Sequence, residues 1–438
     1  MRPSLKTTHR LTLLASACLL SACGMLRSNK EPPTLATLAT QRVAVKPEPV
    51  EGIEEAQAIE AYKQFLDSAP QSPQSAEALR RLADLEMDRA EKANAEANAS
   101  GEPDYRPAIA RYQQHLAAHP QAGNRDLVLY QLARAQEQAG QLEAALQTLT
   151  QLVQAHPDTS YADEAQFRRG ELLFTARQYP QAEMAYAAVL EPDRINPYRD
   201  RALYMQGWAR FKQGRLDDAL QAFFGVLDIK LGHHPGDDNL SALEGLGRAE
   251  RELLEDTFRV ISLSLANMEG AERIDAYIHA PVSAQTPHDA RQGYAFHVYE
   301  QLGEFYLKQD RPKDAADAFN LFATRSPLDA QAPRLHSRVI DIYERAGFAT
   351  LALDAKKQFV AHYGRQSDFR TASPEAWRKA QPLVQTHLTE LARHHHAQAQ
   401  RSKRSVDYQE AAHWYRELLA SFPDDAQAAH HRFLLAEQ

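Results

Sequence analysis

Cysteine is almost absent from this sequence. Only Cys18 and Cys23 occur among 438 residues. The chain beyond residue 23 therefore has no disulfide, no thiolate nucleophile and no cysteine-ligated metal site. Its fold has to be stable through packing alone. The hydrophobic content of 44% over this length is sufficient for a large core.

Sequence motifs of catalytic chemistry are also missing. We find no GxSxG, no HExxH and no glycine-rich loop that would hold a phosphate. Carboxylates are plentiful, but they fall at expected helix starts and on solvent faces, where charge serves solvation. The sequence thus predicts a protein without enzymatic activity, with no catalytic residues, no cofactor and no small-molecule substrate.

Positive charge is in deficit. The formal net charge is −8, which argues against nucleic-acid binding and against a general membrane-surface role. One basic run, formed by Arg401, Lys403 and Arg404, could contact anionic lipid head groups or glycans. The favoured interpretation of this run is a solvated insertion.

Three groups of histidines could bind a divalent cation. They are His233 with His234, residues 394–396, and His430 with His431. Adjacent residues of a helix point about 100° apart, so such neighbours rarely converge on one ion. We therefore predict exposed polar residues at these positions and no metal site.

The apolar run at residues 11–20 is too short to span a bilayer. Arg2, Lys6 and Arg10 precede this run, and Leu20-Ser21-Ala22-Cys23 follows with small residues before a cysteine. This segment resembles a bacterial lipoprotein signal, in which Cys23 is diacylated and becomes the mature N-terminus. An ordinary secretory signal that is cleaved nearby is the alternative.

The same resemblance implies a location. Cys18 fits the signal less well than Cys23, because Ala15 stands where leucine is usual. Gly24 follows Cys23, and in lipoproteins of Gram-negative envelopes a residue other than aspartate there directs sorting to the outer membrane. The implied position is the periplasmic face of the outer membrane, reached through the lipid. Residues 24–51 carry four prolines without a helical or strand period, which predicts a disordered tether.

A period of 37 residues organises the rest of the chain. Steps of 37 from Ala219 lead to Ala182, Ala145 and Ala108, each on the expected second helix of a helical hairpin. A large apolar residue stands four positions after each of these reference alanines, and a glycine stands twelve positions before the best of them. Further reference alanines follow the same pattern at Ala58, Ala315, Ala352 and Ala411.

This spacing of a small residue and an aromatic residue resembles the tetratricopeptide repeat. In several units a proline twelve positions after the alanine adds to the resemblance. The resemblance implies an all-α fold, a right-handed superhelical solenoid of about eight helical hairpins. Its period of 37 exceeds the 34 residues of the standard repeat, so longer helices or turns are expected. Lys356 replaces the aromatic residue in the unit of Ala352. Gly214 is expected to end the first helix of the unit of Ala219.

The period and its interruptions predict six segments. These are a lipoprotein signal peptide (1–23), a proline-rich tether (24–51), N-terminal repeats (52–231), a divergent helical unit with inserted loops (232–290), further repeats (291–364) and C-terminal repeats with an insertion (365–438). We expect the last hairpin to be incomplete, so that further repeats or another chain supply its missing helix. Such an end would expose an apolar edge and favour self-association.

Aromatic residues mark a candidate binding surface. Tyr130, Phe167 and Tyr204 are 37 residues apart on expected first helices, and Trp208 and Phe211 extend the stripe along one helix. In tetratricopeptide repeats this position lines the concave face. An exposed stripe would bind an extended peptide or a partner helix. The alternative is that these rings pack between neighbouring repeats as core.

These features together predict a scaffold that binds other envelope proteins or peptides. Residues 255–264 with the preceding repeats resemble the large repeat lipoproteins of envelope-spanning machineries. Two alternatives are a component of outer-membrane β-barrel protein assembly and an accessory regulator of a peptidoglycan-remodelling enzyme.

Overall fold

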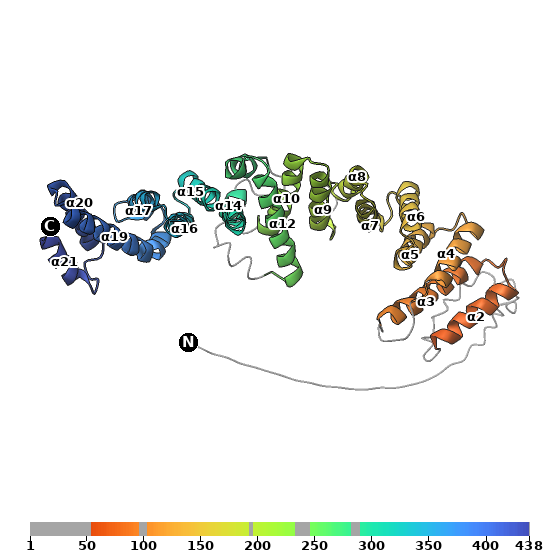
Figure 1. Cartoon of the computed structure of the whole chain (residues 1–438). Helices are drawn as coiled ribbons and strands as arrows, with labels where there is room; N and C mark the ends of the chain where they lie inside the picture. Colours follow the sequence, from red (N-terminus) through yellow and green to blue (C-terminus); the bar gives the residue numbers. More distant parts are fainter. Residues whose placement is uncertain (1–53, 96–102, 192–195, 233–245, 282–289, 438) are drawn as a thin grey trace, which may run out of the picture. The chain divides into compact units, whose positions relative to one another are not determined.

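The computed structural model describes residues 54–95, 103–191, 196–232, 246–281 and 290–437 (Figure 1). Within these residues every regular element is a helix, so the all-α prediction is confirmed. The chain divides into one unit of residues 1–57 and a second of residues 58–438. The predicted signal peptide with Cys23 and the tether lie outside the described residues.

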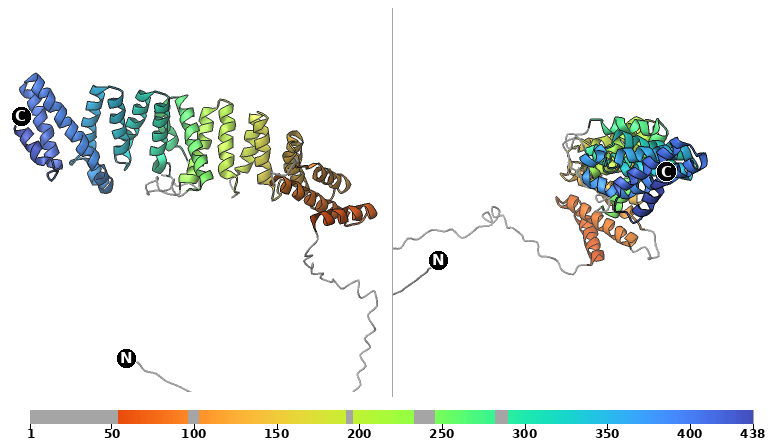
Figure 2. Two further views of the ribbon diagram at one scale, coloured as in Figure 1. Left: turned by 60° about the horizontal axis from the view of Figure 1, so that its bottom comes forward. Right: turned by 90° about the vertical axis from the view of Figure 1, so that its left-hand side faces the viewer.

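Consecutive helical hairpins make up most of the second unit. They are α3 (Ser75–Ala95) with α4 (Arg106–Ala118), α5 (Arg125–Gln138) with α6 (Leu142–Ala155), α7 (Ala162–Thr175) with α8 (Tyr179–Val189), α9 (Arg199–Lys212) with α10 (Leu216–Leu231), α14 (Ala290–Lys308) with α15 (Pro312–Arg325), α16 (Ala332–Arg345) with α17 (Ala349–Tyr363), and α19 (Pro374–Ser402) with α20 (Ser405–Ser421). The helix α2 (Glu55–Ser68) precedes them and α21 (Ala428–Ala436) follows. From α3 onward each long helix packs on the next long helix of the chain (Figure 2). This neighbour-to-neighbour packing defines a solenoid.

A residue in the left-handed backbone conformation closes the first helix of five hairpins. At Gly214 φ is 76°, and the next amide, Arg215 N–H, donates to Arg210 O at 3.0 Å. This is the helix-ending geometry that glycine favours, and it confirms the predicted stop. The equivalent residues, all five positions before a reference alanine, are Gly140, Arg177, Gly214, Asp310 and Gly347.

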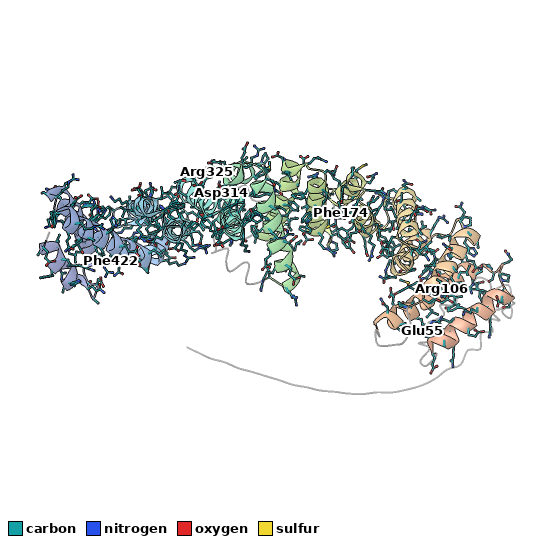
Figure 3. The ribbon with its side chains drawn as sticks, viewed as in Figure 1. Glu55, Arg106, Phe174, Asp314, Arg325 and Phe422 are labelled. Atoms are coloured by element: carbon teal, nitrogen blue, oxygen red, sulfur yellow. The ribbon has the colours of Figure 1, made fainter. Side chains whose placement is uncertain are left out.

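Rings also close the turns within hairpins. Phe174, labelled in Figure 3, lies near the end of α7, and its ring centroid is 5.3 Å from that of Tyr179 at the start of α8. The edge-on arrangement is one that aromatic pairs prefer.

Inside the hairpins, a glycine of the first helix contacts an aromatic ring of the second. A Cβ atom at Gly207 would lie only 2.6 Å from Phe223 Cε1, and one at Gly170 only 2.5 Å from Tyr186 Cε1. Gly303 and Phe319 repeat the contact. Seven of the eight reference alanines are buried, the half-buried Ala58 being the exception. The spacing found in the sequence therefore marks the positions where paired helices approach most closely.

An ion pair replaces this contact in the unit of Ala352. Ile340 stands where the units of Ala182, Ala219 and Ala315 have glycine, and Lys356 stands where those units have a ring. The Lys356 side chain is buried, and its Nζ contacts Glu344 and, at 2.9 Å, Glu390 Oε2. Burial alone would lower the pKa of Lys356, but the two carboxylates outweigh it and the pKa is raised. Lys356 thus links α16, α17 and α19.

A second buried ion pair lies where the period is interrupted. The elements there are α12 (Arg248–Ala266), the 3₁₀ turn η1 (Gly270–Arg273) and α13 (Ile274–Ile278). Arg291 of α14 and Asp228 of α10 are both buried, with Nη2 and Oδ2 2.7 Å apart. Tyr294 donates to Asp228 Oδ1 at 2.7 Å, and Arg291 Nη1 donates to Tyr277 O at 2.6 Å. These bonds satisfy the buried charges, as burial requires.

The C-terminal segment corrects two expectations. The short helix α18 (Asp368–Ala372) precedes α19 in this segment. His395 and His396 were predicted to be exposed, yet both are buried, because α19 continues through them and turns them toward α20. Their rings pack on Trp414 and Tyr415, with centroids 6.1 and 5.8 Å apart. His431 was also predicted to be exposed and is buried, whereas the basic run at residues 401–404 is exposed as expected.

Substitution of two glycines in one hairpin tests the packing rule. We expect Gly207→Ala to lower the free energy of unfolding by about 1–3 kcal/mol, because its Cβ would overlap the Phe223 ring. Gly225→Ala is the matched control, since its Cβ would meet Leu203 at an ordinary 3.5 Å. Alanine there should raise stability by roughly 0.5–1 kcal/mol through helix propensity. Chemical denaturation measures both, and shifts of equal sign and size would contradict the rule.

Stability should also depend on pH through a histidine of α16. The His336 ring is buried, 5.5 Å from the Phe359 ring and 5.8 Å from the Tyr363 ring between centroids, and its Nε2 has no hydrogen-bond partner. Burial, followed by the charges of His362 and His387, lowers the pKa of His336 to about 4.

Because the folded-state pKa of His336 lies below the unfolded value of 6.5, the unfolded chain binds more protons below that pH. The stabilisation is complete above about pH 6.5 and is lost as the pH falls toward 4, by about 3 kcal/mol in total. We therefore expect the difference in unfolding free energy between wild type and His336→Phe to shrink by that amount from pH 7 to pH 4. Denaturation curves at several pH values measure it, and parallel profiles would rule the effect out.

Candidate functional site

Three helices place their side chains on one continuous surface. Tyr204 of α9 donates a hydrogen bond to Asp256 of α12, and α12 packs on α14. Burial and this hydrogen bond raise the pKa of Tyr204 to about 12, so the phenol remains a donor at neutral pH. We call the surface formed by these faces of α9, α12 and α14 the first-helix groove.

Part of the predicted aromatic stripe lies on this surface. Tyr204, Trp208 and Phe211 are half-buried. The Trp208 ring makes edge-on contacts with Tyr204 at 6.4 Å and with Phe211 at 5.4 Å between centroids. Lys212 Nζ lies 5.6 Å from the centre of the Trp208 ring. The three rings thus support one another and keep part of their surface accessible.

Tyr130 and Phe167, predicted for the same stripe, are only 7% and 3% exposed. Tyr130 stacks on Tyr161 with centroids 4.6 Å apart, and Phe167 stacks on Tyr198 at 5.4 Å. Tyr161 and Tyr198 immediately precede α7 and α9, so each ring is covered by the following repeat. Tyr130 and Phe167 therefore belong to the core, the alternative that the sequence left open, and offer no contact surface.

Charged groups reinforce the covered part of the stripe. Arg168 of α7 bonds to Glu137 of α5 at 2.8 Å and to Glu164, one turn away, at 2.8 Å. Burial would raise the pKa of Glu164, but hydrogen bonds from Tyr130, Arg168 and Tyr198 lower it. The network joins neighbouring repeats and is structural in character.

A cavity of about 840 Å³ opens beside the accessible rings, between α12 and α14. Its apolar wall includes Leu254 and Phe258, which are buried, and His297 completes it with 2% of its surface exposed. Asp256 and Arg259 line the cavity and also reach the stripe, since Arg259 lies 5.9 Å from the centre of the Trp208 ring. The cavity and the rings are therefore parts of one surface.

Sequence reasoning missed this cavity. It lies in segment 232–290 and the start of the next segment, where the 37-residue period fails and no reference alanine marks a register. The available signal was length, because α12 and α14 have 19 residues each while α9 has 14.

The chemistry of the site favours contact over catalysis. Its members are rings, aliphatic groups and charges of both signs, an inventory typical of protein interfaces. In the described part of the chain no group of histidine, cysteine and carboxylate residues has the arrangement of a metal site. Of the histidines considered as ligands, His233 and His234 lie outside the described residues. Among the described helices none is long and apolar enough to cross a membrane.

Comparison with known proteins identifies the repeats. Two tetratricopeptide-repeat models match residues 127–159 and 167–230. No match to the chain was found among curated proteins.

Solved structures similar to this chain include a tetratricopeptide repeat protein from Parabacteroides merdae, with 18% identity, 65% of this chain and 92% of that chain covered, and a TM-score of 0.33. The MamA protein is 21% identical over 46% of this chain and 98% of its own, with a TM-score of 0.28. The C-terminal part of a repeat-containing protein from Cytophaga hutchinsonii is 13% identical over 69% and 98%, with a TM-score of 0.26. The spacing and the packing show a helical solenoid, and residues 127–159 and 167–230 of it match the tetratricopeptide repeat.

Proposed function

We propose that this protein is a scaffold without enzymatic activity, which binds partner proteins of an envelope assembly through the first-helix groove. A lipid on Cys23 would hold it at the periplasmic face of the outer membrane. Tetratricopeptide repeats are typical of protein–protein interaction, and that coarse role follows from the matched segments. The location at the outer membrane and the use of the groove as the binding site belong to the proposal.

The observation that carries the proposal is the accessible end of the aromatic stripe beside a cavity. Tyr204, Trp208 and Phe211 are held in place by their mutual contacts, so little side-chain entropy remains to be lost on binding. Tryptophan and tyrosine are the residues that most often dominate binding energy at interfaces. The neighbouring cavity gives a partner side chain a place to become fully desolvated.

The sequence around Cys23 supports the anchor. A diacylated cysteine supplies the two acyl chains that stable membrane attachment requires. Residues 24–51, if flexible, would span roughly 30 Å root mean square. The repeats would then reach partners away from the membrane surface.

Site-specific crosslinking tests the groove. A photoreactive amino acid at Lys212, which is exposed beside Trp208, should capture a defined partner in intact envelopes, because it faces the proposed interface. Met184 on α8 is the matched control, since it is 72% exposed and lies outside the groove. Equal capture from both positions, or capture from Met184 alone, would place the binding surface elsewhere.

Substitution of the predicted lipid site tests the anchor. Cys23→Ala should abolish lipidation and release the protein from membranes, because the attachment depends on the acyl chains. Fractionation and labelling with palmitate measure both effects, and Cys18→Ala is the control. A Cys23→Ala protein that still carries palmitate and stays in the outer membrane would refute the lipid anchor.

A further inference from the structure

The first-helix groove carries positive charges that lack partners. Lys212, Arg251 and Lys308 surround it, and in the described part of the chain no carboxylate oxygen lies within 4 Å of their side-chain nitrogens. Arg251 donates only to a backbone carbonyl, Leu246 O, at 3.3 Å. The net charge of the whole chain is −8. The rim of the groove therefore carries unpaired positive charge, whereas the net charge of the whole chain is negative.

Most acidic side chains of the rim form ion pairs with basic side chains of the same protein. Glu252 pairs with Arg248 at 2.8 Å. Asp256 pairs with Arg259 and accepts the Tyr204 hydrogen bond. Glu255 is the carboxylate of the cavity that has no ion pair among the described residues. Among the described residues, the unpaired charges thus sum to a positive excess at the mouth of the cavity.

The inside of the cavity has different chemistry. Leu254 and Phe258 are 1% and 4% exposed and present an apolar wall. His297 is also buried, and its Nε2 has no hydrogen-bond partner, while its Nδ1 lies 3.8 Å from Glu300 Oε2. A buried polar nitrogen without a partner is costly, and the indole N–H of a tryptophan side chain in the cavity would supply a donor. The volume of about 840 Å³ is within the range of ligand pockets, which runs from about 300 to 1,000 Å³.

We infer that the cavity between α12 and α14 receives one bulky apolar side chain of an acidic segment of the partner protein, with the segment's carboxylates on Lys212, Arg251 and Lys308. The inference rests on the proposed function and names the chemistry of its partner. The apolar wall and Phe258 hold the anchor. The basic rim selects acidic neighbours and repels a basic segment, since unlike charges steer association and like charges oppose it. Trp208 and Phe211 extend the contact beyond the cavity.

Synthetic peptides test this chemistry on the full chain purified in detergent. Each has about 15 residues, enough for four helical turns, and a single tryptophan. The charged positions are glutamate in one peptide and lysine in the second, and a third is the glutamate peptide with alanine for tryptophan. Fluorescence anisotropy should show binding of the acidic tryptophan peptide, weakened on the order of tenfold by the alanine change. Added salt should weaken it as well.

Two variants address the rim and the cavity separately. The combined change Lys212→Glu, Arg251→Glu and Lys308→Glu should reduce binding of the acidic peptide by more than about tenfold and create binding of the lysine peptide. Gln301→Trp places a ring at an exposed position of the cavity wall and should block the anchor while leaving the fold intact. The matched control combines Arg106→Glu and Lys313→Glu, exposed cations on other helices, and should bind as wild type does.

Several outcomes would overturn the inference. They are absence of binding by the acidic peptide, equal binding of the lysine peptide to wild type, and an unchanged affinity in the charge-reversed variant. Sedimentation that shows a dimer dissolved by Gln301→Trp would assign the cavity to a second copy of the chain and would equally contradict it. If Lys212 crosslinks to a partner but the acidic peptide does not bind, the scaffold proposal stands. Only the inferred chemistry of the partner is then wrong. Failure of the crosslink would instead remove the first-helix groove as the proposed binding surface.

Discussion

The close approach of a glycine on one helix to a ring on the next is the contact on which this structure depends. In the hairpin of α9 and α10, Gly207 leaves no room for a Cβ beside Phe223. The contact fixes how near the paired helices lie and which faces they turn to each other. Repeated every 37 residues in neighbouring hairpins, it fixes the position of each following helix as well. The accessible stripe on α9 is a consequence, because Tyr204 and Trp208 both pack edge-on against the same Phe223 ring.

In two places where this contact is missing, buried ionic groups join the helices. Lys356 joins three helices through two carboxylates, and Arg291 joins α14 to α10 through Asp228. Such pairs are costly to bury and specify one arrangement only when fully bonded. The second of them joins the two helices that flank the divergent unit (232–290), in which α13 has five residues beside the longer α12. The cavity lies between α12 and α14, beside these helices of unequal length. The interruption of the repeat and the candidate site therefore occupy the same part of the chain.

Much of the fold could be predicted from the sequence, because the decisive contacts are local and periodic. The stop at Gly214, the buried Ala219 and the pairing of Gly207 with Phe223 all follow from offsets within one hairpin. The site could be predicted only in part. Spacing placed Tyr130 and Tyr204 on the same helix face, but it could not show that Tyr161 covers the first. His395 and His396 were predicted to be exposed because helical spacing alone could not show that this part of α19 packs on Trp414 and Tyr415 of α20.

The proposed binding mode requires that a partner cover the accessible end of the stripe and leave the other exposed apolar residues free. Hydroxyl-radical footprinting of the protein in intact envelopes, compared with the purified protein, measures this most directly through the oxidation rate of each side chain. The account predicts slower oxidation of Trp208 and Phe211 in envelopes and an unchanged rate at Met184, which is 72% exposed on α8. Unchanged rates at Trp208 and Phe211 together with protection of Met184 would contradict it.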